Sequence, residues 1–162
     1  MTLDDFVRFG RAQKYFRTLG HRPPPAAVKA IEIALRTELP DSYRELVLEH
    51  GFVRWFGVSI FGIDPDEEES TVVRTLEERA NLSDSQSFAC MPERGNFIAE
   101  IFGGGFCFLY GNNSDRAGQV AAHAPDDEYR EVQYWRSIED YFEFVAVRSK
   151  NWVSVGAQGS DV

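Results

Sequence analysis

A series of strand-like segments follows one another between residues 87 and 135 with very short connections. The segments, rich in β-branched and aromatic residues, are 87–91, 96–102, 106–111, 119–124 and 131–135. A parallel pair of strands needs a crossover of about a dozen residues or more, and none of these connections is that long. The sequence therefore predicts a sheet that is mostly antiparallel.

The stretch "NFIAEIFGGGFCFLYG" predicts a β-hairpin whose turn uses glycines at 103–105. A phosphate-binding loop is not indicated, because such a loop needs a helix behind it and a strand follows here. Side chains alternate between the two faces of a strand. We expect one face of the first arm to hold Phe97, Ala99 and Ile101, and one face of the second arm to hold Phe106, Phe108 and Tyr110.

Apolar residues recur at helical spacing in the rest of the chain. The predicted helices are 3–19, about 25–37, 41–50, 71–81 and one that begins after Ser137. Ser42 and Glu45 match a capping box for the third helix, and Gly51 is a natural residue to follow its end. On the fourth helix, the expected inward residues are Val72, Val73, Leu76 and Ala80.

The order of elements is helices, a strand region over 53–63, a helix, closely spaced strands and a last helix. This order predicts an α+β fold, in which a mostly antiparallel central sheet has helices packed on one side. We divide the chain into an N-terminal helical extension (1–22), an α+β domain (23–150) and a C-terminal tail (151–162).

The net charge of −9, from 17 basic and 26 acidic residues, limits the classes of partner. Nucleic acid and anionic membrane surfaces would be repelled, whereas a basic protein would be attracted. The alternative is that the charge only keeps the domain soluble. The N-terminus lacks a secretory signal, no run of residues is apolar enough to span a membrane, and Cys90 and Cys107 are expected to be buried thiols. We therefore expect a cytoplasmic protein.

Two acidic segments are candidates for partner binding. The first contains Asp64, Asp66, Glu67, Glu68 and Glu69, and the second contains Asp126, Asp127 and Glu128. Either segment is a solvated loop or an anionic surface that steers a cationic partner, and adjacency of the two would favour binding. A calcium loop is disfavoured, because the sixth position of the first segment is Glu69 rather than glycine.

Arg54 and Trp55 form a third candidate, because arginine and tryptophan are enriched at interface hot spots. The alternative for Trp55 is an ordinary place in the core.

No pattern in the sequence indicates catalysis, a metal or a cofactor. Ser59 lacks the glycine that a nucleophile elbow needs two residues later, since Phe61 stands there. The three histidines, His21, His50 and His123, are scattered and have no partner at metal-ligand spacing. We predict a protein that binds rather than one that catalyses.

The stretch "RTELPDSYRELVLEHGF" (36–52) resembles the best-marked segment of the SUKH superfamily. The matching residues are Ile31 and Leu35 on one helix, then Leu39, Pro40, Tyr43, Leu46 and Gly51. The predicted hairpin resembles the central hairpin of the superfamily, and "EVQYWRSIEDYFEFV" resembles its last strand and closing helix. The resemblance covers roughly residues 24–148.

The superfamily groups fungal Smi/Knr cell-wall regulators with bacterial immunity proteins. The resemblance implies an immunity protein that binds a cognate toxin domain, such as a nuclease, and covers its active site. Since many such toxins bind nucleic acid and are basic, an acidic surface would suit them. The alternative is a non-catalytic regulatory or scaffold module that binds a host protein. Fold does not determine function, so both remain hypotheses.

Overall fold

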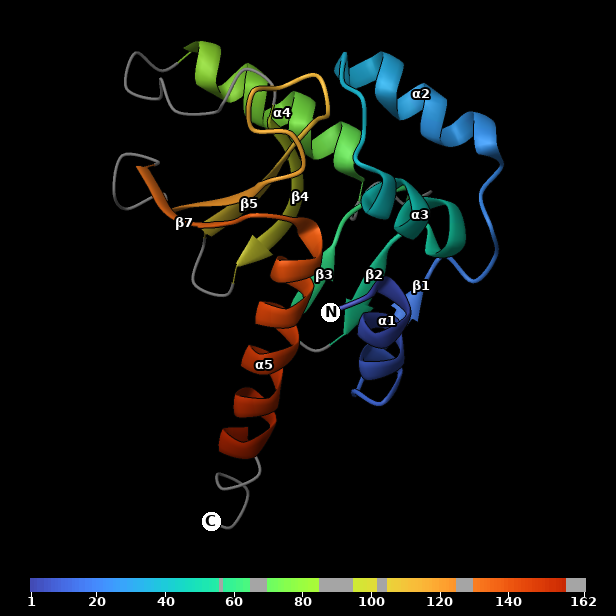
Figure 1. Ribbon diagram of the computed structural model, residues 1–162, viewed down its shortest axis with the longest axis vertical. Helices are drawn as coiled ribbons and strands as arrows, with labels where there is room; N and C mark the ends of the chain where they lie inside the picture. The colour runs from blue at the N-terminus through green and yellow to red at the C-terminus, as the bar shows by residue number, and fades with distance from the viewer. Residues whose placement is uncertain (56, 65–69, 85–94, 102–104, 125–129, 157–162) are drawn as a thin grey trace.

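In the described part of the chain, seven strands form one antiparallel sheet (Figure 1). The computed structural model describes residues 1–55, 57–64, 70–84, 95–101, 105–124 and 130–156. Its strands are β1 (Arg17–Thr18), β2 (Val53–Trp55), β3 (Val58–Ile60), β4 (Gly95–Ile101), β5 (Gly105–Tyr110), β6 (Val120–Ala124) and β7 (Arg130–Trp135). They lie in the order β1-β2-β3-β4-β5-β6-β7, and each pairs antiparallel with the next. The predicted α+β fold is confirmed.

The helices of the described residues are α1 (Leu3–Arg11), α2 (Pro25–Leu35), α3 (Asp41–His50), α4 (Thr71–Asp84) and α5 (Ile138–Gly156). Apolar residues from α1, α2, α3 and α5 join one face of the sheet in a single core, which we call the main core. Phe6 of α1 lies between Trp55 of β2 and Phe142 of α5, with ring centroids 4.9 and 4.3 Å away. Such aromatic pairs contribute about 0.5–1.5 kcal/mol beyond the burial of their area.

The first helix is shorter than predicted. It ends at Arg11, and the chain then turns through Tyr15, which has a φ of 63°. Arg17 and Thr18 instead pair with β2 as a strand. The helical spacing of Phe16 and Leu19 was misleading, because pairing with a sheet edge satisfies the same backbone groups.

The hairpin of β4 and β5 is confirmed, but the predicted face of its first arm is wrong. A β-bulge lies between Phe97 and Ala99, so that Phe97 pairs with Phe108 and Ala99 pairs with Cys107. Ala99 and Cys107 belong to the main core, whereas Phe97 and Phe108 lie in a separate cluster. A bulge adds one residue to a strand and so reverses the alternation beyond it.

Helix α4 also differs from the prediction in the face it buries. Thr71 and Thr75 are buried, while Leu76 is 45% exposed. The Thr75 hydroxyl accepts a hydrogen bond from the Phe97 backbone N–H at 2.9 Å, which holds this polar face against β4. Ala80 is exposed as well, so two of the residues expected to point inward do not.

The expected capping box of α3 does not form. Pro40 is the N-cap residue, and the Ser42 hydroxyl donates a hydrogen bond to Glu139 of α5 instead. The helix ends at His50 as predicted, and Gly51 follows it with a φ of 72°. The predicted strand 87–91 and the glycine turn at 103–104 lie outside the described residues.

Candidate partner-binding surface

The stretch 36–52 forms the corner between α2 and α3 and lies largely in the core. Leu39, Tyr43 and Leu46 are fully buried. The Tyr43 hydroxyl donates to the Phe61 carbonyl at 2.7 Å and lies 2.5 Å from the Thr71 hydroxyl. Tyr43 therefore ties α3 both to the end of the β3 region and to the start of α4.

A second set of contacts fixes the angle of this corner. Glu32 of α2 accepts the Leu39 backbone N–H at 3.0 Å and forms an ion pair with Arg44 of α3 at 2.6 Å. Both acceptor contacts fall on one carboxylate oxygen, so the helix, the corner and the next helix are held together. This region is scaffold that positions the chain on either side of it.

The first acidic segment lies only partly within the described residues. Asp64 is half-buried, and Asp66, Glu67, Glu68 and Glu69 lie outside the described ranges. Just before and after them, Gly62 and Ser70 form a β-bridge.

The second acidic segment, Asp126, Asp127 and Glu128, lies wholly outside the described ranges. Before and after it, Ala124 of β6 pairs with Arg130 of β7. This pair lies toward the end of the sheet where β4 meets β5 at Ile101 and Gly105.

The strands that precede the two acidic segments approach opposite ends of the sheet. Ile60 pairs with Ala99, and the Phe61 N–H donates to the Ile98 carbonyl, so the chain after β3 runs toward Gly95. Gly95 stands at the opposite end of β4 from Ile101. Adjacency of the two segments, which lie almost wholly outside the described residues, stays a prediction.

Arg54 and Trp55 point to opposite faces of β2. Trp55 is 2% exposed, contacts Phe6 in the main core, and donates its indole N–H to Ser149 at 3.3 Å. Trp55 is thus a core residue, the second of the two alternatives for it. Arg54 is half-buried and stands opposite Ser59 of β3, on the face of the sheet away from the main core.

That other face, which we call the outer face, carries aromatic side chains at its centre. Phe61, Phe97 and Phe108 form a buried cluster, with Phe106 packed against it. The Phe97 ring centroid is 5.1 Å from that of Phe61, and the guanidinium of Arg74 lies 5.3 Å above the same ring. The outer face is therefore apolar beneath and charged at its surface.

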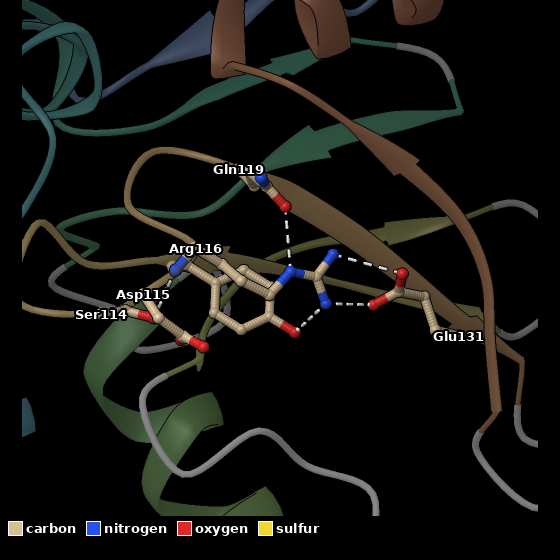
Figure 2. Close-up of polar contacts among 6 residues, drawn as sticks. Ser114, Asp115, Arg116, Gln119 and Glu131 are labelled. Carbon is tan, nitrogen blue, oxygen red and sulfur yellow. Dashed lines mark hydrogen bonds and ion pairs between the residues drawn. The ribbon is translucent and has the colours of Figure 1, made fainter.

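Beside these rings lies a polar cluster centred on Arg116, in the turn between β5 and β6 (Figure 2). Its guanidinium carbon lies 4.4 Å from the centroid of the Tyr110 ring, and Nη1 donates to the Tyr110 hydroxyl at 2.8 Å. Two further N–H groups reach the Glu131 carboxylate at 2.5 and 3.2 Å, and Nε donates to Gln119 at 2.9 Å. A bidentate pair of this kind is specific in direction as well as in charge.

The charges of this cluster affect one another. The hydrogen bond to Glu131 raises the pKa of Arg116, so this guanidinium stays protonated. Burial raises the pKa of Tyr110; Arg116 opposes this rise, while Glu131 and Asp115 add to it. The Tyr110 hydroxyl therefore remains a neutral group at physiological pH.

The sequence alone does not indicate this cluster. Arg116 lies in the connection between two predicted strands, and its partner Glu131 is 15 positions away. A signal was present in the alternating aromatics of β5, since a turn arginine that follows them is placed to stack on the last ring. Nothing local in the sequence predicts its partner on β7.

The outer face carries groups that are common at protein interfaces. Among the described residues, no group of three or more histidine, cysteine, aspartate or glutamate side chains could hold a metal ion. The ion pairs and aromatic rings of the outer face are instead suited to contact another molecule.

Comparison with models of protein families shows to which family the chain is related. The model described as SUKH_6, SMI1-KNR4 cell-wall, matches residues 26–142. The protein belongs to this SMI1-KNR4 family. Among curated proteins, none matches the chain.

The SMI1-KNR4 match confirms the resemblance seen in the sequence, and the wider SUKH family is associated with immunity proteins and is generally non-catalytic. The match begins at α2, yet Leu3, Phe6 and Val7 of α1 are buried in the same main core. Within the part of the chain that is described, no helix is both long and apolar enough to cross a bilayer.

Proposed function

We propose that this protein is an immunity protein that binds and neutralises a cognate bacterial toxin domain in the cytoplasm. The observation that carries the proposal is the family match over residues 26–142, because this family is associated with immunity proteins. The protein would act by occupying the active site of the toxin and would need no cofactor or chemistry of its own.

The net charge of −9 supports a basic partner, such as a nuclease domain. Opposite charges steer two proteins together and raise the rate of association. In this proposal the toxin contacts Asp64 and the segments 66–69 and 126–128, and Arg54 lies at the edge of the contact. Trp55 contributes only by supporting the core beneath Arg54.

Co-expression with the C-terminal domain encoded by the adjacent gene tests the proposal. Rescue of growth, together with a copurified complex that weakens as salt increases, is the expected result. A neighbour that is harmless, or that kills in the presence of this protein, would count against an immunity function.

Charge reversal of residues 66–69 then tests the acidic surface separately. The expected outcome is slower association with a flatter dependence on salt, because steering depends on these charges. Reversal of four exposed acidic residues elsewhere, Asp4, Glu38, Glu45 and Asp140, is the control, because it changes the net charge by the same amount. Equal kinetics in the 66–69 variant and the wild type would remove this segment from the interface.

A second candidate is a non-catalytic regulatory or scaffold module that binds a host protein. The description of the matching family as a cell-wall one favours it. A stable endogenous partner, recovered with the tagged protein in the absence of any toxin gene, is the result expected for this function.

A further inference from the structure

The outer face of the sheet presents an exposed tyrosine beside the Arg116 cluster. Tyr134 of β7 is 57% exposed and pairs with Ala121 of β6, which in turn pairs with Phe108 of β5. Phe108 lies on the outer face, and residues directly opposite each other in neighbouring strands share a face. Tyr134 therefore stands on the outer face as well.

The Arg116 guanidinium crosses the row of directly paired residues that contains Tyr134, which we call the rung of Tyr134. Tyr110 lies two residues along β5 from Phe108, on one side of this rung. Glu131 pairs with His123 on the other side of it. Since the guanidinium contacts both Tyr110 and Glu131, it spans the intervening rung above the small, buried Ala121.

This arrangement leaves a carboxylate held in place next to an exposed ring. Glu131 accepts two hydrogen bonds from Arg116, but each carboxylate oxygen can accept more than one. The side chain of Glu131 is 31% exposed, so its remaining lone pairs are open to another molecule. Arg116, in contrast, already directs its donors at Gln119, Tyr110 and Glu131.

The local charge favours a cation. Asp115 is exposed at the turn and acts on both Arg116 and Tyr110, so the cluster of Asp115, Glu131 and Arg116 carries a net charge of −1. The whole chain carries −9. A second guanidinium or ammonium can therefore approach Glu131 without net repulsion.

We infer that Tyr134 and Glu131 form a receptor for an arginine or lysine side chain that projects from a basic protein partner. The cation pairs with the free lone pairs of Glu131 and stacks on the Tyr134 ring, while Arg116 keeps the carboxylate oriented. That this partner is a toxin domain rests on the proposed function; the receptor itself rests on the geometry above.

Titration with N-acetyl-arginine methylamide, followed by NMR, tests the receptor without any toxin. The expected result is a set of saturable shifts in β5, β6 and β7, including the Tyr134 ring protons. The citrulline analogue, which has nearly the same shape and no charge, should shift none of them. Scattered shifts over all the acidic residues, or equal shifts with citrulline, would overturn the inference.

Two pairs of variants make the test specific. Tyr134→Ala is expected to weaken arginine binding about threefold, the size of an exposed cation–π contact. Tyr15→Asn is its control, because Tyr15 is 75% exposed elsewhere and asparagine tolerates its positive φ. Glu131→Gln is expected to abolish binding, and Glu45→Gln, on exposed α3 surface, to leave it unchanged. Equal affinities within either pair would contradict the assignment.

The toxin complex supplies an independent readout. If the wild type binds the neighbouring toxin domain, Tyr134→Ala should speed dissociation, and an unchanged complex would place the toxin elsewhere. If no toxin is bound but the arginine shifts appear as described, the proposed function fails and the receptor stands.

Discussion

Removal of one hydroxyl group, in the variant Tyr43→Phe, tests how the corner of the fold is held. Tyr43 is fully buried, and its hydroxyl donates to the Phe61 carbonyl at 2.7 Å and contacts the Thr71 hydroxyl at 2.5 Å. The variant keeps the ring, so the packing of α3 is preserved. What it removes is the polar link between α3, the end of the β3 region and α4.

The expected loss follows from these two contacts. A buried hydrogen bond contributes about 0.5–1.5 kcal/mol net, and a buried group left without its partner costs about 1–3 kcal/mol. Thr71 is itself fully buried, so water cannot easily replace the lost hydroxyl. We expect Tyr43→Phe to lower the free energy of unfolding by about 2–3 kcal/mol. For a chain of this size, the Tm should fall by about 4–10 °C.

Urea unfolding monitored by tryptophan fluorescence measures this change. Tyr141→Phe is a matched control, because Tyr141 is 3% exposed but its hydroxyl bonds to the Cys107 thiol, a weak partner. Its expected loss is below about 1 kcal/mol. Equal losses in the two variants, or a loss below about 0.5 kcal/mol for Tyr43→Phe, would refute the reasoning.

Three further outcomes are expected. Gly62→Ala should lower the free energy of unfolding in urea by about 3 kcal/mol or more, because a Cβ there would lie 1.9 Å from the Gly51 carbonyl oxygen. The control Gly20→Ala, whose Cβ would have no atom within 4 Å, should cost only about 1 kcal/mol because of the positive φ at this position. Burial lowers the pKa of His50 below 6.5, so the NMR titration of this histidine should have its midpoint below pH 6.5. The stability that His50 contributes is present above pH 6.5 and should be lost as the pH falls, and a His50→Gln variant should not show this loss. Burial raises the pKa of Cys107 to about 12, so this thiol should resist alkylation at pH 8 until the protein unfolds. The contribution of Cys107 to the free energy of unfolding should decline as the pH rises above about 9. Alkylation of Cys107 in the native protein, mapped by mass spectrometry, would contradict the expected protection.

Short-range patterns predicted most of the elements. The helices 25–35 and 41–50 and the hairpin of β4 and β5 agree with their apolar spacing and with the shortness of the connections. These features depend on neighbouring residues and on the lengths of the connections, and the sequence gives both directly. The family resemblance rests on the same short segments and is confirmed over 26–142.

The misassigned elements are those where a distant strand competed with local preference. Residues 16–19 have helical spacing, but β2 offers them strand pairing. Leu76 faces solvent because Thr75, one residue earlier, bonds to the backbone of β4. In each case the deciding hydrogen bond joins residues more than 20 positions apart, and local pattern cannot register it.

The net charge, most of the helices and strands, the antiparallel sheet and the family all follow from the amino-acid sequence. The outer face with Arg116, Glu131 and Tyr134 does not, because its members come from a turn and a strand that meet only once the sheet has a register. Glu131 and Tyr134 are three residues apart, and they share the outer face because the register of β7 against β6 shifts between Gln133 and Glu131. The outer-face cluster of this protein is thus a product of strand register, which long-range packing selects.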